Sequence, residues 1–241
     1  CKASFTRVCR DRTSTDMEEQ LSFDLPVRTA LGREDFFLSP ANALAVTALD
    51  GDWPDGKLAL IGPAGSGKTH LAHVWAADSG AVIVPASGLA ERDLPALAEG
   101  PVAVEDVPRI AGHRDDETAL FHLHNMLAAN GNRLLISGRT VPRRWALVLP
   151  DLQSRCEGAT VASLDPPDDA LLAAVLQKLF RDRQIMPKGA VIPYLVRHME
   201  RTFEAAARIV ARMDQIALDK ARGVTVKLAS EVLAEEANGA A

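Results

Sequence analysis

The sequence has few cysteines, few aromatic residues, no long apolar run and no excess of positive charge. Its 241 residues include three cysteines, Cys1, Cys9 and Cys156. Three cysteines are too few for a disulfide framework, which favours a reducing compartment and predicts a cytoplasmic location. No apolar stretch approaches the roughly 18 residues of a membrane-spanning helix, so we expect no membrane span.

The charge balance argues against DNA binding as the main task of the chain. Lys and Arg number 27 against 32 Asp and Glu, which gives a formal net charge of −5. A protein that holds a DNA backbone needs clustered positive charge, so we expect no direct sequence-specific DNA binding. Hydrophobic residues make up 47% of the chain and aromatic residues 5%, a composition that is globular rather than disordered.

The amino-terminal segment 1–32 is predicted to be a flexible tail. Residues 1–16 are polar and mixed in charge, and they lack the apolar core of a signal peptide. Met17 opens the segment MEEQLSFDLP. We interpret Met17 as the natural start of the protein and residues 1–16 as an upstream extension.

Five short apolar runs predict an α/β domain over 33–165. The runs are rich in β-branched residues, as are strands of a parallel sheet that is covered on both faces. Helical patterns lie between most of them, and this alternation predicts a doubly wound sheet. In the pattern at 116–129, Asp115 or Asp116 is expected to cap the start and Asn130-Gly131 to end the helix. The apolar runs occupy 58–62, 81–86, 102–107, 133–138 and 160–164.

After Pro166-Pro167 the pattern changes to one of helices, which predicts a second, mostly helical domain over 166–241. Only TVKL (225–228) interrupts it, as a possible short extended piece. The helical patterns occupy 168–183, 189–199, 202–221 and 228–236.

A glycine-rich loop predicts a nucleotide site. Its sequence matches G-x-x-x-x-G-K-[ST] in full and lies between the apolar run LALIG and a helical pattern. Backbone N–H groups in such a loop surround phosphates, Lys68 supplies charge to the β- and γ-phosphates, and the Thr69 hydroxyl is offered to Mg²⁺. We therefore expect ADP or ATP with Mg²⁺ as cofactors. The loop consists of Gly62, Pro63, Ala64, Gly65, Ser66, Gly67, Lys68 and Thr69.

Polar residues at the ends of two later runs complete the predicted site. Glu105 and Asp106 lie near the end of VAVEDV, where Glu105 is expected to reach Mg²⁺ and Asp106 to polarise the attacking water. The usual order places Asp first, so slow hydrolysis is expected from the longer Glu105 side chain. The other interpretation is an acidic loop after a strand. Ser137, near the end of RLLISG, is either a third phosphate-site residue or an ordinary strand-end turn residue.

Taken together, residues 33–236 resemble the AAA+ ATPases, and specifically the nucleotide-binding domain of the DnaA family. The resemblance implies a P-loop parallel-sheet domain followed by a small helical lid. It places Ser137 as sensor I and Arg155, in LPDLQSR, as an arginine finger that acts across a subunit interface, which implies a homo-oligomer. Arg201, in RTFEAA, matches sensor II and is implied to lie over the phosphates. The residues implied to pack against the base are Phe37 and Leu38, and His70 is assigned to the same nucleotide site.

The tail carries a peptide that resembles the sliding-clamp-binding motif. Gln20 begins QLSFDLP, and the apolar side chains that would enter the clamp pockets are those of Leu21, Phe23 and Leu25. The implied partner is the DNA polymerase III sliding clamp (β subunit). Nothing after residue 223 has the length or the basic charge of a helix-turn-helix module, so none is expected.

This layout resembles that of DnaA-related regulatory AAA+ proteins and implies DnaA as a second partner. The implied function is negative regulation of replication initiation, by promoting hydrolysis of DnaA-bound ATP from the clamp. Intrinsic ATPase activity would then be weak or regulatory. The first alternative is an autonomous AAA+ ATPase of helicase-loader type. The second is a DnaA-like binding protein that contacts DNA or membrane-positioned partners.

Overall fold

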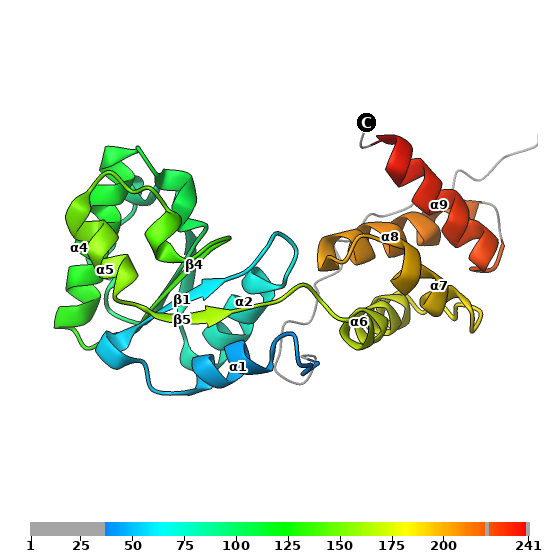
Figure 1. Cartoon of the computed structure of the whole chain (residues 1–241), viewed down its shortest axis with the longest axis horizontal. Helices are drawn as coiled ribbons and strands as arrows, with labels where there is room; N and C mark the ends of the chain where they lie inside the picture. Colours follow the sequence, from blue (N-terminus) through cyan, green and yellow to red (C-terminus); the bar gives the residue numbers. More distant parts are fainter. Residues whose placement is uncertain (1–36, 220–221, 240–241) are drawn as a thin grey trace, which may run out of the picture. The chain divides into compact units, whose positions relative to one another are not determined.

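The computed structural model describes residues 37–219 and 222–239. Its first part contains one sheet of five parallel strands in the order β2–β3–β4–β1–β5. Figure 1 labels β1, β4 and β5 of this sheet. Each expected apolar run forms a strand, so the predicted α/β sheet is confirmed. Strands β1 and β4, at the middle of the sheet, are buried along their whole length. The strands are β1 Lys57–Ile61, β2 Val82–Pro85, β3 Val102–Glu105, β4 Leu134–Gly138 and β5 Thr160–Ser163.

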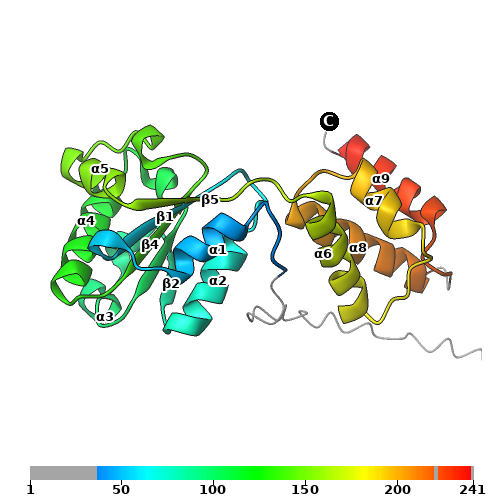
Figure 2. The same ribbon diagram turned by 60° about the horizontal axis from the view of Figure 1, so that its bottom comes forward.

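Helices cover both faces of the sheet because alternate strand residues point to opposite faces. On one face Val104 and Ile136 pack with Leu120 and Leu123 of α4. On the other, Leu60 belongs to a cluster that includes residues of α1 and α2. Figures 1 and 2 show these two helices next to each other. The α-helices are α1 Ala43–Asp50, α2 Lys68–Ser79, α3 Leu94–Leu97, α4 Arg114–Ala129 and α5 Pro150–Glu157. Short 3₁₀ turns occupy Pro54–Gly56, Leu89–Glu91, Val107–Ile110 and Pro142–Arg144.

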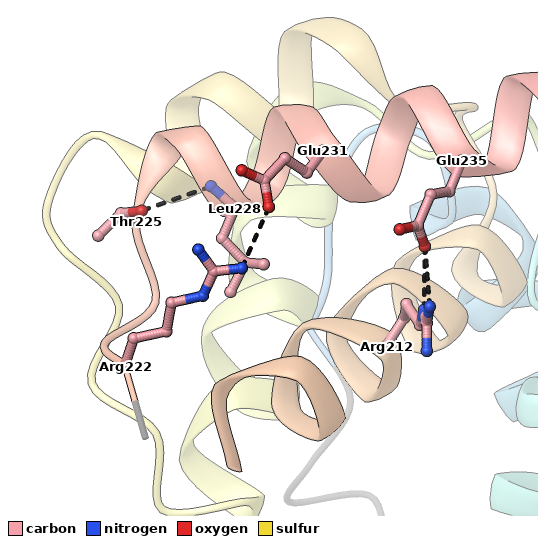
Figure 3. Close-up of polar contacts among 6 residues, drawn as sticks. All are labelled: Arg212, Arg222, Thr225, Leu228, Glu231 and Glu235. Carbon is pink, nitrogen blue, oxygen red and sulfur yellow. Dashed lines mark hydrogen bonds and ion pairs between the residues drawn. The ribbon is translucent and has the colours of Figure 1, made fainter. Parts of the chain in front are cut away.

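The later residues form a helical lobe with an apolar core of its own. It consists of α6 Asp169–Asp182, α7 Val191–His198, α8 Phe203–Asp219 and α9 Val226–Gly239. Ion pairs join α9 to α8 and to the segment before α9; Figure 3 shows Arg212 with Glu235 and Arg222 with Glu231. These pairs are exposed, so each contributes little, and the core carries most of the stability. Among its most buried residues are Leu172, Leu176, Phe180, Leu195, Val210 and Met213.

Two local predictions are wrong. The run TVKL is not extended, because α9 begins at Val226 and the Leu228 N–H group donates to the Thr225 hydroxyl at 3.4 Å (Figure 3). Helix α4 begins at Arg114, so neither aspartate caps it. Instead the Asp116 carboxylate accepts N–H groups of Gly88 and Ala90. The aspartate that the local pattern assigned as the cap of α4 instead contacts a segment that is distant in sequence.

In the part of the chain that the structure describes, every helix is too short or too polar to cross a membrane.

Candidate functional site

Three strand ends bring the predicted site residues to one edge of the sheet. The glycine-rich loop 62–67 follows β1, Ser137 lies on β4, and Glu105 ends β3. Strand β4 lies between the other two and pairs with both. Since all these strands are parallel, their carboxyl ends meet at the same edge, where open α/β sheets bind ligands. Ser137 therefore lies between the loop and Glu105, in the row of Leu60 on β1.

The loop has a backbone that only glycine adopts without strain. Gly65 and Gly67 have φ angles of +68° and +92°. Lys68, which begins α2, is 9% exposed. Its ammonium donates to the carbonyl oxygens of Gly62 at 2.8 Å and Pro63 at 2.7 Å. The lysine therefore occupies the hollow of the loop, and a phosphate oxygen that enters there must replace these carbonyls as its acceptor.

Charged side chains gather around Lys68. Burial lowers the pKa of this lysine, the nearby carboxylates of Asp106, Glu204 and Glu105 oppose that shift, and Arg139 reinforces it. Glu204 comes from the helical lobe and Arg139 from the segment after β4. Glu204 stands in RTFEAA, three residues after Arg201, and Arg139 directly follows RLLISG, but neither was assigned a role. The residue spacing could not show that Glu204 comes close to the loop lysine.

Asp106 and Ser137 are in direct contact. The Asp106 N–H group donates to the Ser137 hydroxyl oxygen at 3.0 Å. Asp106 has a φ angle of +56°, a left-handed conformation that is rare outside glycine. Its carboxylate lies 3.9 Å from the Arg109 guanidinium. Such outliers are frequent at functional sites, because the surrounding structure holds the strain to aim a side chain.

Glu105 offers an oxygen that fits a metal ion. Its Oε1 atom is buried and has no hydrogen-bond partner, and a hard cation such as Mg²⁺ prefers carboxylate oxygens. Thr69, the other expected ligand, is exposed at the start of α2. In the described residues no group of three or more His, Cys, Asp or Glu side chains is placed to hold a metal.

The start of α8 contacts the loop. The Phe203 N–H group donates to the Gly65 carbonyl oxygen at 3.2 Å. A Cβ atom on Gly67 would lie 2.7 Å from the Phe203 ring, and one on Gly65 would collide with Thr202. These two glycines are thus required by the close approach of the lobe as well as by their φ angles.

Arg201 precedes α8 but contacts α6. Its guanidinium donates to the Pro167 carbonyl oxygen at 3.2 Å and forms an ion pair with Asp169. Arg201 is exposed. The predicted role over the phosphates requires this arginine to exchange Asp169 for a phosphate oxygen.

Arg155 lies on the exposed side of α5. In residues 37–219 and 222–239, no carboxylate lies within ion-pair distance of its guanidinium. The start of α5 is fixed by Glu117, which is 0% exposed and accepts the N–H groups of Val148 at 3.1 Å and Leu149 at 2.7 Å. The same carboxylate accepts the Gly112 N–H group at 2.9 Å. The role of Glu117 was not predicted from the sequence. The feature that could have indicated it is an acidic residue on the apolar face of the helical pattern at 116–129.

The residues predicted to lie beside the base are more exposed than those around the loop. Phe37 and Leu38 are 47% and 58% exposed, and the Asn42 amide donates to the Phe37 carbonyl oxygen at 2.9 Å. His70 is half-buried on α2. The clamp-motif residues Gln20, Leu21, Phe23 and Leu25 lie outside the described residues.

Comparison with solved structures identifies the fold. No family model matches the chain. Domain III of the Thermotoga maritima replication initiation protein DnaA matches with a TM-score of 0.75 at 19% identity, over 88% of this chain and 98% of that one. DnaA from Aquifex aeolicus, bound to AMPPCP, matches with a TM-score of 0.61 at 16% identity, over 77% of this chain and 64% of that one.

A point mutant of Thermotoga maritima RuvB matches with a TM-score of 0.60 at 18% identity, over 80% of this chain and 67% of that one. The chain therefore shares its fold with these DnaA and RuvB structures, an α/β P-loop domain with a helical carboxyl-terminal part.

Proposed function

We propose that the protein is an adenine-nucleotide-binding AAA+ regulator of DNA replication initiation. The fold supports the AAA+ class, and replication proteins are among its structural neighbours. The glycine-rich loop with Lys68, beside Glu105, Asp106 and Ser137, supports nucleotide binding. One of the neighbours, the Aquifex aeolicus DnaA, is bound to the nucleotide analogue AMPPCP.

The nucleotide is ADP or ATP, with its phosphates in loop 62–67. Loop N–H groups and Lys68 bind the phosphates, while Phe37, Leu38 and His70 border the base. Thr69 and Glu105 would hold Mg²⁺, which when bound adds positive charge beside the phosphates. The altered acidic pair at 105–106 makes intrinsic hydrolysis weak, so the nucleotide acts mainly as a conformational ligand.

The particular protein that this chain resembles is Hda, the DnaA-related regulator that acts with the sliding clamp. In this proposal residues 20–25 dock on the clamp, and α5 presents Arg155 to the ATP held by DnaA. The observation that carries the proposal is the exposed Arg155, free of carboxylate partners in the described residues, on a helix whose start Glu117 holds by two hydrogen bonds. The proposal also includes a homo-oligomer, in which a second copy of the chain meets the same face.

The test is stimulation of DnaA ATP hydrolysis in the presence of clamp and DNA. An arginine finger contributes about 10³–10⁵ in rate, so Arg155→Ala should lose nearly all stimulation. Arg144→Ala is the matched control, because Arg144 is an exposed arginine eleven residues earlier in the same segment. Full stimulation by the Arg155 variant would refute the proposal.

The alternative is an autonomous ATPase of helicase-loader type. The buried Oε1 atom of Glu105 and the nearness of both acids to Lys68 favour it, since these groups are what intrinsic hydrolysis requires. Steady-state turnover by the isolated protein separates the two functions. A rate of about 1 s⁻¹ or more, within the usual enzyme range, would favour the alternative.

A further inference from the structure

Glu117 is a buried carboxylate that joins the turn after β3 to the start of α5. The residue lies in the first turn of α4 and is 0% exposed. Its Oε1 atom accepts the N–H groups of Gly112 at 2.9 Å and Val148 at 3.1 Å. Its Oε2 atom accepts the N–H group of Leu149 at 2.7 Å. A buried carboxylate is costly unless it is hydrogen-bonded, so these three bonds account for its place in the core.

The first of the two joined segments begins at the predicted metal-site acids. Asp106 follows Glu105 and precedes the 3₁₀ turn Val107–Ile110. The Arg109 N–H group donates to the Asp106 carbonyl oxygen at 2.9 Å, and the first and last residues of the turn are 0% exposed. Gly112 lies two residues beyond this turn. Because the intervening backbone is short and anchored in the core, a change at the two acids is passed on to the Gly112 N–H group.

The second segment positions α5 and therefore Arg155. Leu149 directly precedes α5, and its side chain forms no capping hydrogen bond. Gln153 bonds to the backbone of 142–147, but this glutamine lies on α5 itself and joins neighbouring residues of one segment. The Glu117 carboxylate comes from a different helix and so fixes where α5 begins relative to the rest of the domain. The direction in which α5 presents Arg155 therefore depends on Glu117.

We propose that Glu117 is a positioning residue for Arg155 and responds to the nucleotide that this chain itself binds. When Glu105 and Asp106 are engaged by a nucleotide and its metal, the turn after them is held and the Gly112 bond persists. The carboxylate of Glu117 is then held as well, and it keeps the start of α5 in place. Without nucleotide these contacts open more often, so Arg155 is presented less firmly. This inference rests on the proposed function, because it concerns the arginine that acts on the partner's nucleotide.

The first experiment measures amide hydrogen exchange of the full-length protein with and without saturating ADP and Mg²⁺. The N–H groups of Val148 and Leu149 should exchange about fivefold more slowly with nucleotide, the lower end of the usual coupling between two sites. The control is the Ala96 N–H group, which donates to the Asp93 carboxylate at 3.2 Å on another helix and should not respond. Unchanged exchange at Val148 and Leu149 would overturn the proposal, as would equal slowing at Ala96.

Glu117→Gln tests the carboxylate itself. A glutamine offers one acceptor oxygen in place of two, so at least one of the three N–H groups loses its partner. ADP should then no longer slow exchange at Val148 and Leu149. Asp115→Asn is the matched control, because it removes the same charge from an exposed position in the first turn of α4. It should keep the slowing, whereas slowing that survives in Glu117→Gln would refute the proposal.

A double variant keeps the proposal testable if Glu117→Gln does not fold. Glu105→Gln with Asp106→Asn removes both acids, and asparagine tolerates the left-handed backbone at 106. At ADP concentrations that calorimetry shows to be saturating, this variant should exchange at Val148 and Leu149 as the nucleotide-free protein does. Persistent slowing would show that the signal does not start at the acids and would overturn the proposal.

The second experiment connects Glu117 to the proposed function. In the assay of DnaA ATP hydrolysis with clamp and DNA, Glu117→Gln should lower the maximal rate by about tenfold to a hundredfold, the effect of a small misplacement of a reacting group. The protein concentration for half-maximal stimulation should not change, because residues 20–25 are intact. An unchanged maximal rate would refute the positioning role. Absence of stimulation by the unmodified protein would refute the proposed function instead, and the exchange measurements would still decide whether Glu117 links the acids to α5.

Discussion

At the scale of single residues, two buried polar groups at the site lack the partners that a nucleotide and its metal would supply. Lys68 donates to loop carbonyls, and the Oε1 atom of Glu105 has no partner. Both groups are buried where a polar atom normally requires a partner. A nucleotide with its metal would supply acceptors to the lysine and a cation to the glutamate, which is why the two together support the proposed nucleotide site.

His124 gives a prediction about pH. Burial lowers its pKa below the usual 6.5, with Lys57 and Arg155 reinforcing the shift and the Asn125 side chain opposing it. As pH falls below 6.5, the unfolded chain binds a proton before the folded one does. The unfolding free energy should therefore decrease with falling pH, by at most about 1.4 kcal/mol per unit, and level off below the folded pKa.

The measurement is urea unfolding between pH 5 and 8, with His124→Gln compared against the unmodified protein. The variant should lose this part of the pH dependence. His122→Gln is the control, since His122 is exposed on the same helix. Identical pH profiles for His124→Gln and the unmodified protein would contradict the assigned cause.

At the scale of elements, the first residue of α6 holds Arg201, which precedes α8, by an ion pair with Asp169. If Arg201 serves as sensor II, the pair competes with the phosphates for the same guanidinium. Both side chains are exposed, so the pair contributes at most about 1 kcal/mol. Asp169→Asn should therefore tighten ADP binding by about twofold to fivefold, measured by calorimetry.

The control for that prediction is Asp182→Asn, which removes another ion-paired carboxylate from the same helix, where Asp182 pairs with Lys178. It should leave ADP affinity unchanged. Weaker ADP binding in Asp169→Asn would show instead that the ion pair holds the lobe in the binding-competent position.

Elements whose signal is local were predicted well from the sequence. The buried strands and loop 62–69 follow from apolar runs and a motif of fixed spacing. The capping of α4 and the start of α9 were missed, because Asp116 and Thr225 each have several possible hydrogen-bond partners. The contact of Phe203 with Gly65, and the burial of Lys57 and Glu117, could not be predicted. Each depends on segments that are distant in sequence.

At the scale of the whole molecule, the proposed function assigns separate tasks to the sheet domain, the helical lobe and the tail. The sheet domain carries the loop and Arg155, and the lobe contacts that loop through Phe203. A regulator that acts on another protein's nucleotide needs to be brought close to it. Tethering by a short peptide raises the effective concentration of the tethered domain without adding a large interface.

The tail therefore gives the prediction that separates the regulator from the autonomous ATPase. Gln20→Ala with Leu21→Ala should reduce retention of the protein on immobilised sliding clamp by at least about tenfold, because a few anchor side chains carry most of the affinity of such peptides. Glu18→Ala with Glu19→Ala changes two neighbouring residues outside the motif and should bind normally. Both variants should bind ADP alike, since the glycine-rich loop is unchanged. Equal retention of both double variants would remove the clamp from the proposed function, while loss in the first alone would tie clamp binding to residues 20–25.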